Sequence, residues 1–137
     1  MAGLARTVAM LRILGDDLDP DAVSRLLGAR PTAGARKGDV RLSASGREVV
    51  ARSGSWRLRA EDHSPGDLST QIRDLLTKLT DNLAVWRELS RRYRCDIFCG
   101  LFMSESNEGG TLEPDVLSML GDRGLPLGLD IHDASPD

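Results

Sequence analysis

The sequence lacks the features that mark secreted and membrane proteins. Its two cysteines, Cys95 and Cys99, stand four residues apart in a segment with the pattern of a strand. Four strand residues span about 13 Å, too far for a disulfide, so we expect reduced thiols and a cytoplasmic protein. No apolar run approaches the roughly 18 residues of a membrane span, and the N-terminus has no signal-peptide pattern. We therefore expect no membrane partner and no export.

Aromatic residues are also scarce, and there is no excess of positive charge. Aromatic residues make up 4% of the chain, and the net charge is −3. An acidic chain of this kind has no overall field that attracts nucleic acid, so we expect no nucleic-acid partner. The motifs Gly-x-Ser-x-Gly, His-Glu-x-x-His and Cys-x-x-Cys are missing. We therefore predict no catalytic residue, no cofactor and no dedicated metal site.

What is present suits one ordinary globular domain. The chain has 137 residues, of which 40% are hydrophobic and 28% charged. A chain of this length can bury a core without disulfides or metals. We predict a single domain over residues 1–137, with an ordered core at about 7–132 and a frayed tail at 133–137.

Two helices are predicted to begin in the same way. Leu18-Asp19-Pro20-Asp21 is echoed by Leu112-Glu113-Pro114-Asp115. In each, an acidic residue is placed to cap a helix, proline takes the first helical position, and the next aspartate favours the positive helix end. Apolar spacings of three and four predict two more helices between these. The predicted helices are 20–27, 68–79, 81–93 and 114–122.

Alternating apolar residues predict the strands, and a hairpin is expected around Ser53-Gly54. The segment 95–103 is apolar on both faces, which favours a central strand, whereas 29–46 has the composition of a loop. The order β-α-β-β-α(α)-β-α-β predicts an α+β two-layer sandwich, a mixed or antiparallel sheet with helices packed on one face. The predicted strands are 7–14, 47–52, 55–60, 95–103 and 125–131.

Several short motifs follow one another in a fixed order along the chain. They are Leu11-Arg12-Ile13-Leu14-Gly15-Asp16-Asp17-Leu18-Asp19-Pro20, Leu26-Leu27-Gly28-Ala29-Arg30-Pro31-Thr32, Lys37-Gly38, a lone Trp56, and Gly124-Leu125-Pro126-Leu127-Gly128-Leu129-Asp130-Ile131. With them the chain resembles the bacterial domain-of-unknown-function 4279 family, from about residue 7 to 132. The resemblance implies a small bacterial protein without an assigned activity, and for members at toxin–immunity loci a binding role. His132 departs from the tyrosine usual in the family, and no catalytic residue is implied.

The loop at 30–39, which we call the basic loop, is the strongest candidate for a binding surface. It is long for a connection in a compact domain, and Arg30, Arg36 and Lys37 are suited to an anion or an acidic protein surface. The acidic turn at 15–19 contains Asp16 and Asp17, and its opposite charge would help to recognise a protein partner. Helix capping and turn formation would explain the same carboxylates without any ligand.

Asp130 and His132 form a second candidate, on the polar side of the last strand. If the first and last strands were neighbours, these residues and the acidic turn would surround a cation such as Mg²⁺. This is the alternative hypothesis, a metal-dependent or small-ligand enzyme. A strand with one face in water would show the same alternation without any site.

Trp56 is the last candidate, as a ring that lines a pocket or packs in the core. Taken together, the sequence favours a non-enzymatic binding or interaction domain, with an immunity-type role as one form. A protein partner is expected, and a homo-oligomer joined through exposed sheet edges stays open.

Overall fold

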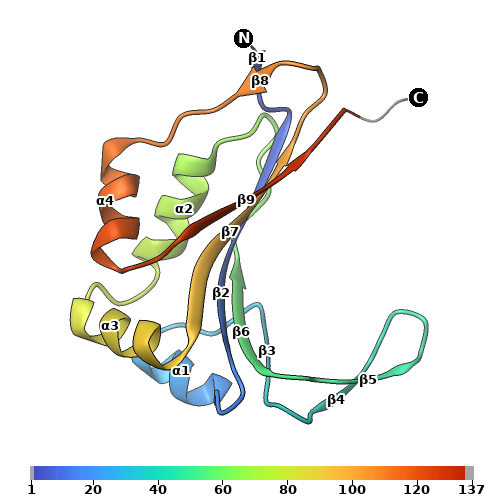
Figure 1. The fold of residues 1–137 in the computed structure, drawn as a ribbon, viewed down its shortest axis with the longest axis vertical. Coiled ribbons are helices and arrows are strands. Elements are labelled where there is room, and N and C mark those ends of the chain that lie inside the picture. Colours follow the sequence, from blue (N-terminus) through green and yellow to red (C-terminus); the bar gives the residue numbers. More distant parts are fainter. Residues whose placement is uncertain (1, 135–137) are drawn as a thin grey trace.

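The computed structural model describes residues 2–134 and shows an α+β fold (Figure 1). A five-stranded mixed sheet has the order β3-β6-β2-β7-β9, and only β7 and β9 are parallel neighbours. The helices lie together on one side of this sheet. This confirms the predicted fold class. The sheet strands are β2 (Arg6–Gly15), β3 (Ala33–Ala35), β6 (Gly54–Arg59), β7 (Arg94–Phe102) and β9 (Leu127–His132).

The helices begin where the sequence predicts them. Asp19 caps the first by accepting a hydrogen bond from the amide of Asp21 at 3.0 Å, and Gly28 ends it with φ 79°. Glu113 stands at the corresponding position of the last helix but makes no side-chain cap bond. Asn82 separates the two middle helices by capping the second of them. The helices are α1 (Pro20–Leu27), α2 (Leu68–Thr77), α3 (Leu83–Arg92) and α4 (Pro114–Asp122).

The core lies between the sheet and the helices. On β2, Thr7, Ala9, Leu11 and Ile13 are fully buried, whereas the residues between them are only partly covered. The alternation places every second side chain beneath the helices. The other face of the sheet, which we call the outer face, is covered by no helix (Figure 1). The helices contribute the facing side chains Val23, Leu27, Ile72, Leu75, Leu76, Trp86, Leu89, Val116 and Leu120.

Two small sheets complete the described chain. A two-residue pairing joins the N-terminal strand to the segment before α4. The second sheet is an antiparallel ribbon that projects from the body, and we call residues 40–50 the ribbon (Figure 1). Residues 135–137 of the predicted frayed tail lie outside the described part. These strands are β1 (Ala2–Gly3), β8 (Glu108–Gly109), β4 (Val40–Leu42) and β5 (Glu48–Val50).

The predicted hairpin around Ser53-Gly54 is wrong, and so is the loop predicted at 29–46. Strand β5 pairs with β4, whereas β6 pairs with β2 on one side and β3 on the other. Both edges of β6 are therefore occupied, and β5 finds its partner within the supposed loop. β3 and β4 have three residues each; β3 is Ala-Gly-Ala, which has no apolar alternation, and the alternation of Val40-Arg41-Leu42 in β4 is too short to predict a strand by itself.

The central strand predicted at 95–103 is confirmed, because β7 lies inside the sheet between β2 and β9, with helices over one of its faces. On β9, Leu129 is 52% exposed and Ile131 is 61% exposed, although their side is the helix side. β9 is an edge strand, and its far half extends past the helices (Figure 1), which leaves that end of the strand without a helix over it.

These placements predict different costs for two leucine truncations. Leu76 is fully buried in the core, so Leu76→Ala should lower the free energy of unfolding by about 2–5 kcal/mol. Leu129→Ala should lower it by less than about 1 kcal/mol, because half of that side chain is already in water. Urea unfolding of both variants measures the difference. Equal losses would contradict the exposed position of Leu129.

Candidate functional site

The acidic turn and the basic loop lie side by side. Lys37 Nζ donates to Asp16 Oδ2 at 3.3 Å, and an Arg36 Nη2 donates to Asp19 Oδ1 at 2.9 Å and lies 3.7 Å from Asp21 Oδ2. These exposed pairs stabilise the fold by at most about 1 kcal/mol each. Their position is more informative, because Arg36 and Lys37 stand where the chain leaves the body for the ribbon. The charges predicted to meet a partner meet each other at the base of the ribbon.

The binding candidates Arg30, Asp17 and Trp56 do not join these ion pairs. Arg30 and Asp17 are exposed and form no ion pair within residues 2–134. Trp56 is fully buried on β6, where its Nε1 donates to Ser24 Oγ at 3.0 Å. Its ring therefore packs in the core and is not offered to a ligand at the surface.

The cation cluster of the alternative hypothesis does not form among the described residues. β7 lies between β2 and β9, so the first long strand and the last are not neighbours. His132 pairs with Phe102 and so lies beside the start of β2, whereas Asp16 and Asp17 follow its end. Over the described residues, no group of three or more His, Cys, Asp or Glu side chains is placed to hold a metal ion.

The outer face instead carries stacked cations and rings. The Arg6 guanidinium lies 4.6 Å from the centroid of the Phe102 ring, and His132 stacks on that ring at 4.4 Å and 8°. His132 Nε2 also lies 3.0 Å from Asp130 Oδ2. Strand register explains the order, because Arg6, Phe102 and His132 are cross-strand neighbours. Such contacts contribute about 0.5–1 kcal/mol each at exposed sites.

A second stack lies further along the outer face. Arg12 covers the Phe98 ring at 4.3 Å and forms two hydrogen bonds with Asp96, at 2.9 and 2.7 Å. The hydrogen bonding that Arg12 donates to Asp96 raises the pKa of the Arg12 guanidinium. The fork-like pairing fixes the guanidinium plane over the ring. The arginine is therefore held in one orientation.

Asp62 completes the outer face at one end. It accepts hydrogen bonds from Arg6 at 2.6 Å and from Arg59 at 2.9 Å. The hydrogen bond from Arg6 lowers the pKa of the Asp62 carboxyl most, and the bond from Arg59 lowers it further. Sequence reasoning missed this surface. The detectable signal was the spacing of Arg6 with Arg12 and of Phe98 with Phe102, since an even separation puts both members on one strand face.

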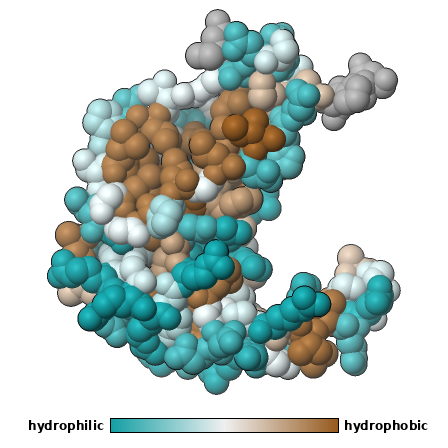
Figure 2. Space-filling view, in the orientation of Figure 1, coloured by the Kyte–Doolittle hydropathy of each residue, from teal (hydrophilic) through white to brown (hydrophobic). Residues whose placement is uncertain are grey.

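The ribbon projects on the same side as the outer face (Figure 1). In the space-filling view the two form the lower arm and the inner wall of a C-shaped molecule (Figure 2). We call this surface, the outer face together with the ribbon, the concave face. On the ribbon, Val40, Leu42 and Val50 are 59%, 69% and 56% exposed. These apolar side chains have no covering layer within the described chain.

Positive charge is concentrated in the segment that builds the ribbon and β6. Residues 36–59 contain seven lysines and arginines and two acidic residues, a net charge of +5 in a chain of net −3. Asp39 binds the amide of Arg36 at the base of the ribbon. Carboxylates of other segments neutralise part of this charge, because Arg36, Lys37 and Arg59 form ion pairs with Asp19, Asp16 and Asp62. The ribbon and β6 are thus a basic segment of an acidic chain.

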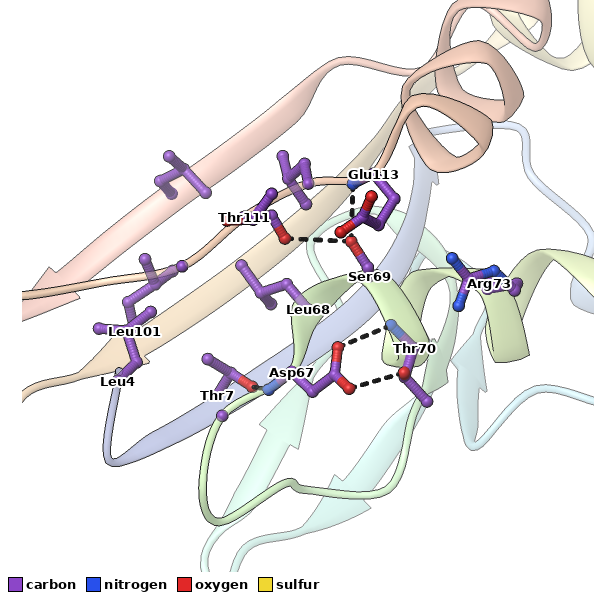
Figure 3. A pocket seen from close by; sticks show the side chains of 14 residues that line it. Leu4, Thr7, Asp67, Leu68, Ser69, Thr70, Arg73, Leu101, Thr111 and Glu113 are labelled. Atoms are coloured by element: carbon purple, nitrogen blue, oxygen red, sulfur yellow. Dashed lines mark hydrogen bonds between the residues drawn. The ribbon is translucent and has the colours of Figure 1, made fainter. Parts of the chain in front are cut away.

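A third feature is a groove of about 440 Å³ on the helix side (Figure 3). Its apolar wall includes Leu4, Leu68, Leu101 and Leu129. Most of its polar groups already have partners. Asp67 binds Thr70 as the cap of α2, Ser69 bridges Thr111 and the amide of Glu113, and Arg73 binds Asp115. The groove therefore offers mainly an apolar surface.

Comparison with known families agrees with the motifs. The family model described as Domain of unknown function (DUF4279) matches residues 5–134. The chain belongs to this family. The DUF4279 match covers the whole five-stranded sheet and all four helices, so the resemblance predicted from sequence is confirmed. The searches of curated proteins and of solved structures found no match. Membership in DUF4279 therefore assigns no activity, and the surfaces of the molecule carry the functional argument.

The paired state of Asp62 predicts an acid-sensitive contribution to stability. Its pKa is lowered in the folded state, so its charge stabilises the fold above the unfolded pKa near about 4. This contribution is lost as the pH falls through the lower folded pKa. The thermal midpoint of the native chain should therefore fall more than that of Asp62→Asn on acidification below about pH 4, as measured by circular dichroism.

Asp17→Asn is the matched control, because Asp17 makes no ion pair within the described residues. That variant should follow the native chain on acidification. If Asp62→Asn followed the native chain as well, the two arginine contacts would not persist in solution.

Proposed function

We propose that this DUF4279 domain is a non-enzymatic interaction module whose concave face binds an acidic surface on another protein. The observation that carries the proposal is the ribbon. A two-stranded ribbon is marginally stable in water by itself, and this one exposes Val40, Leu42 and Val50. A bound partner would cover these side chains and remove them from water.

The charge of the concave face supports an acidic partner. The net charge of +5 over residues 36–59 attracts acidic surfaces and speeds their encounter. Arg57 is exposed on the outer face and, within residues 2–134, forms no ion pair, so it is free to bind a carboxylate. Arg6 and Arg12 are already paired with aspartates and contribute rigid, flat stacking surfaces.

The mixture of apolar and charged side chains on the concave face favours a protein partner over a nucleic acid. A phosphate backbone is recognised by charge and hydrogen bonds, and the exposed valines and leucine of the ribbon would find no apolar counterpart there. A protein interface combines an apolar centre with a charged rim. The ribbon carries both kinds of side chain, on its two faces, because Arg41 stands on the face of β4 opposite Val40 and Leu42.

We place this function in the cytoplasm. Cys95 and Cys99 are free, and burial raises the pKa of their thiols to about 11 and about 12, which suits unreactive core cysteines. No helix in the described chain is long and apolar enough to cross a bilayer. Neutralising an acidic toxin surface, as an immunity protein does, would be one form of the proposed binding.

Affinity capture from the native host with three immobilised baits tests the proposal. The baits are the native chain, the concave-face variant Leu42→Asp/Arg57→Glu, and the control Arg87→Glu/Arg91→Glu on α3, which lies on the helix side. The expected result is an acidic protein retained by the native and control baits and lost from the concave-face variant. Its binding to the purified native chain should weaken as salt is added.

Three results would contradict the proposal. A protein lost only from the α3 bait would place the binding surface on the helix side. Retention of a nucleic acid, sensitive to nuclease, would identify the wrong class of partner. Capture of nothing specific by the native bait would leave the ribbon without the partner that the proposal requires. Circular dichroism of each bait confirms that it is folded before the comparison.

A further inference from the structure

The free edge of β9 is the second surface that the fold leaves without a partner. β9 ends the strand order of the main sheet. The amide of Ile97 donates to Pro126 O at 2.9 Å and that of Met103 to His132 O at 3.1 Å, so even-numbered residues of β9 point their backbone toward β7. In a parallel pair the residues between them point theirs the other way. Leu129 and Ile131 therefore present backbone N–H and C=O groups at the open edge.

This edge lacks three of the devices that usually protect one. Soluble proteins place lysine, proline or a bulge on an exposed edge strand, and β9 runs Leu-Gly-Leu-Asp-Ile-His over six residues without any of them. Its helix side adds apolar surface, because Leu129 and Ile131 are more than half exposed. Leu117 on α4 is 51% exposed as well. Figure 2 shows apolar side chains gathered over α4, α2 and the upper part of β9.

We infer that the β9 edge is the contact between two copies of this chain. The two β9 strands would pair antiparallel about a twofold axis and join the two sheets into one. Such a contact is self-complementary, as a twofold interface requires. The backbone groups of Leu129 and Ile131 gain partners, and their side chains meet those of the second copy on the helix side. The apolar groove beside Leu129 is then covered at its edge.

Charge selects the register of the pairing. With the axis midway between Leu129 and Ile131, Asp130 would face Asp130 of the second copy, and like charges directly opposite one another destabilise a sheet. With the axis at Ile131, Asp130 faces His132 of the second copy on both sides. These residues already lie 3.0 Å apart within one chain, so the four side chains would form one alternating cluster on the outer face.

A substitution at the axis tests the contact. Sedimentation velocity of the full chain over a concentration series should show a dimer for the native protein and a monomer for Ile131→Lys. Ile131 is 61% exposed, so the variant should fold, which circular dichroism checks. The matched control is Leu42→Lys, the same kind of change at a ribbon residue that is 69% exposed. It should remain a dimer.

Crosslinking tests the register. In the proposed pairing the two copies of residue 131 face each other at about 5.5 Å, whereas the two copies of residue 129 lie about 13 Å apart along the strands. A bis-maleimide shorter than that separation should crosslink Ile131→Cys far more than Leu129→Cys. The native thiols, with pKa values raised to about 11 and about 12, should give no product.

Four outcomes would overturn the inference. A native chain that stays monomeric at every concentration would show that the two copies do not form this contact. A dimer broken by Leu42→Lys and not by Ile131→Lys would place it on the ribbon. Stronger crosslinking at 129 than at 131 would reject the register. Open-ended growth into larger species would show an aggregating edge in place of a closed twofold pair. None of these measurements involves the acidic partner proposed for the concave face, so the two proposals fail separately.

Discussion

The helices pack on one side of the sheet only, and the other features of the structure depend on this constraint. Beneath the helices, β2 contributes three fully buried side chains, Ala9, Leu11 and Ile13. All four helices are engaged on that side, so the outer face has no covering layer. The residues between the buried ones, among them Arg6 and Arg12, must then stand on the outer face. The stacked arginines and rings follow directly from the one-sided core.

The two unpartnered surfaces differ in chemistry, and the difference follows from where they lie. The concave face includes the ribbon and β6, whose segment 36–59 has a net charge of +5, and it combines charge with the exposed apolar side chains of the ribbon. The β9 edge is backbone flanked by Leu129 and Ile131. A basic, partly apolar concavity suits a different partner, whereas a symmetric strand edge suits a copy of the same chain. One domain can therefore carry both contacts at once.

Much of the fold was predictable from local signals. The helix starts at Pro20 and Pro114 were marked by an acidic residue followed by proline, and period-two alternation marked β2. The family was predictable from ordered motifs and is confirmed over residues 5–134. The partner of β5 was not predictable. It pairs with β4 rather than β6 because both edges of β6 are already occupied by other strands. A strand's partner is a property of the whole sheet.

The sequence by itself determined the fold class, the approximate positions of the helices and which residues of each strand share a face, since these depend on neighbours within a few positions. Tertiary structure alone decided the strand order, and with it the separation of Asp16 from His132. It also decided that Arg36 and Lys37 meet carboxylates of the same chain and that Leu129 stays exposed. The physical reason is that long-range pairing and coverage depend on chain segments that are far apart in sequence.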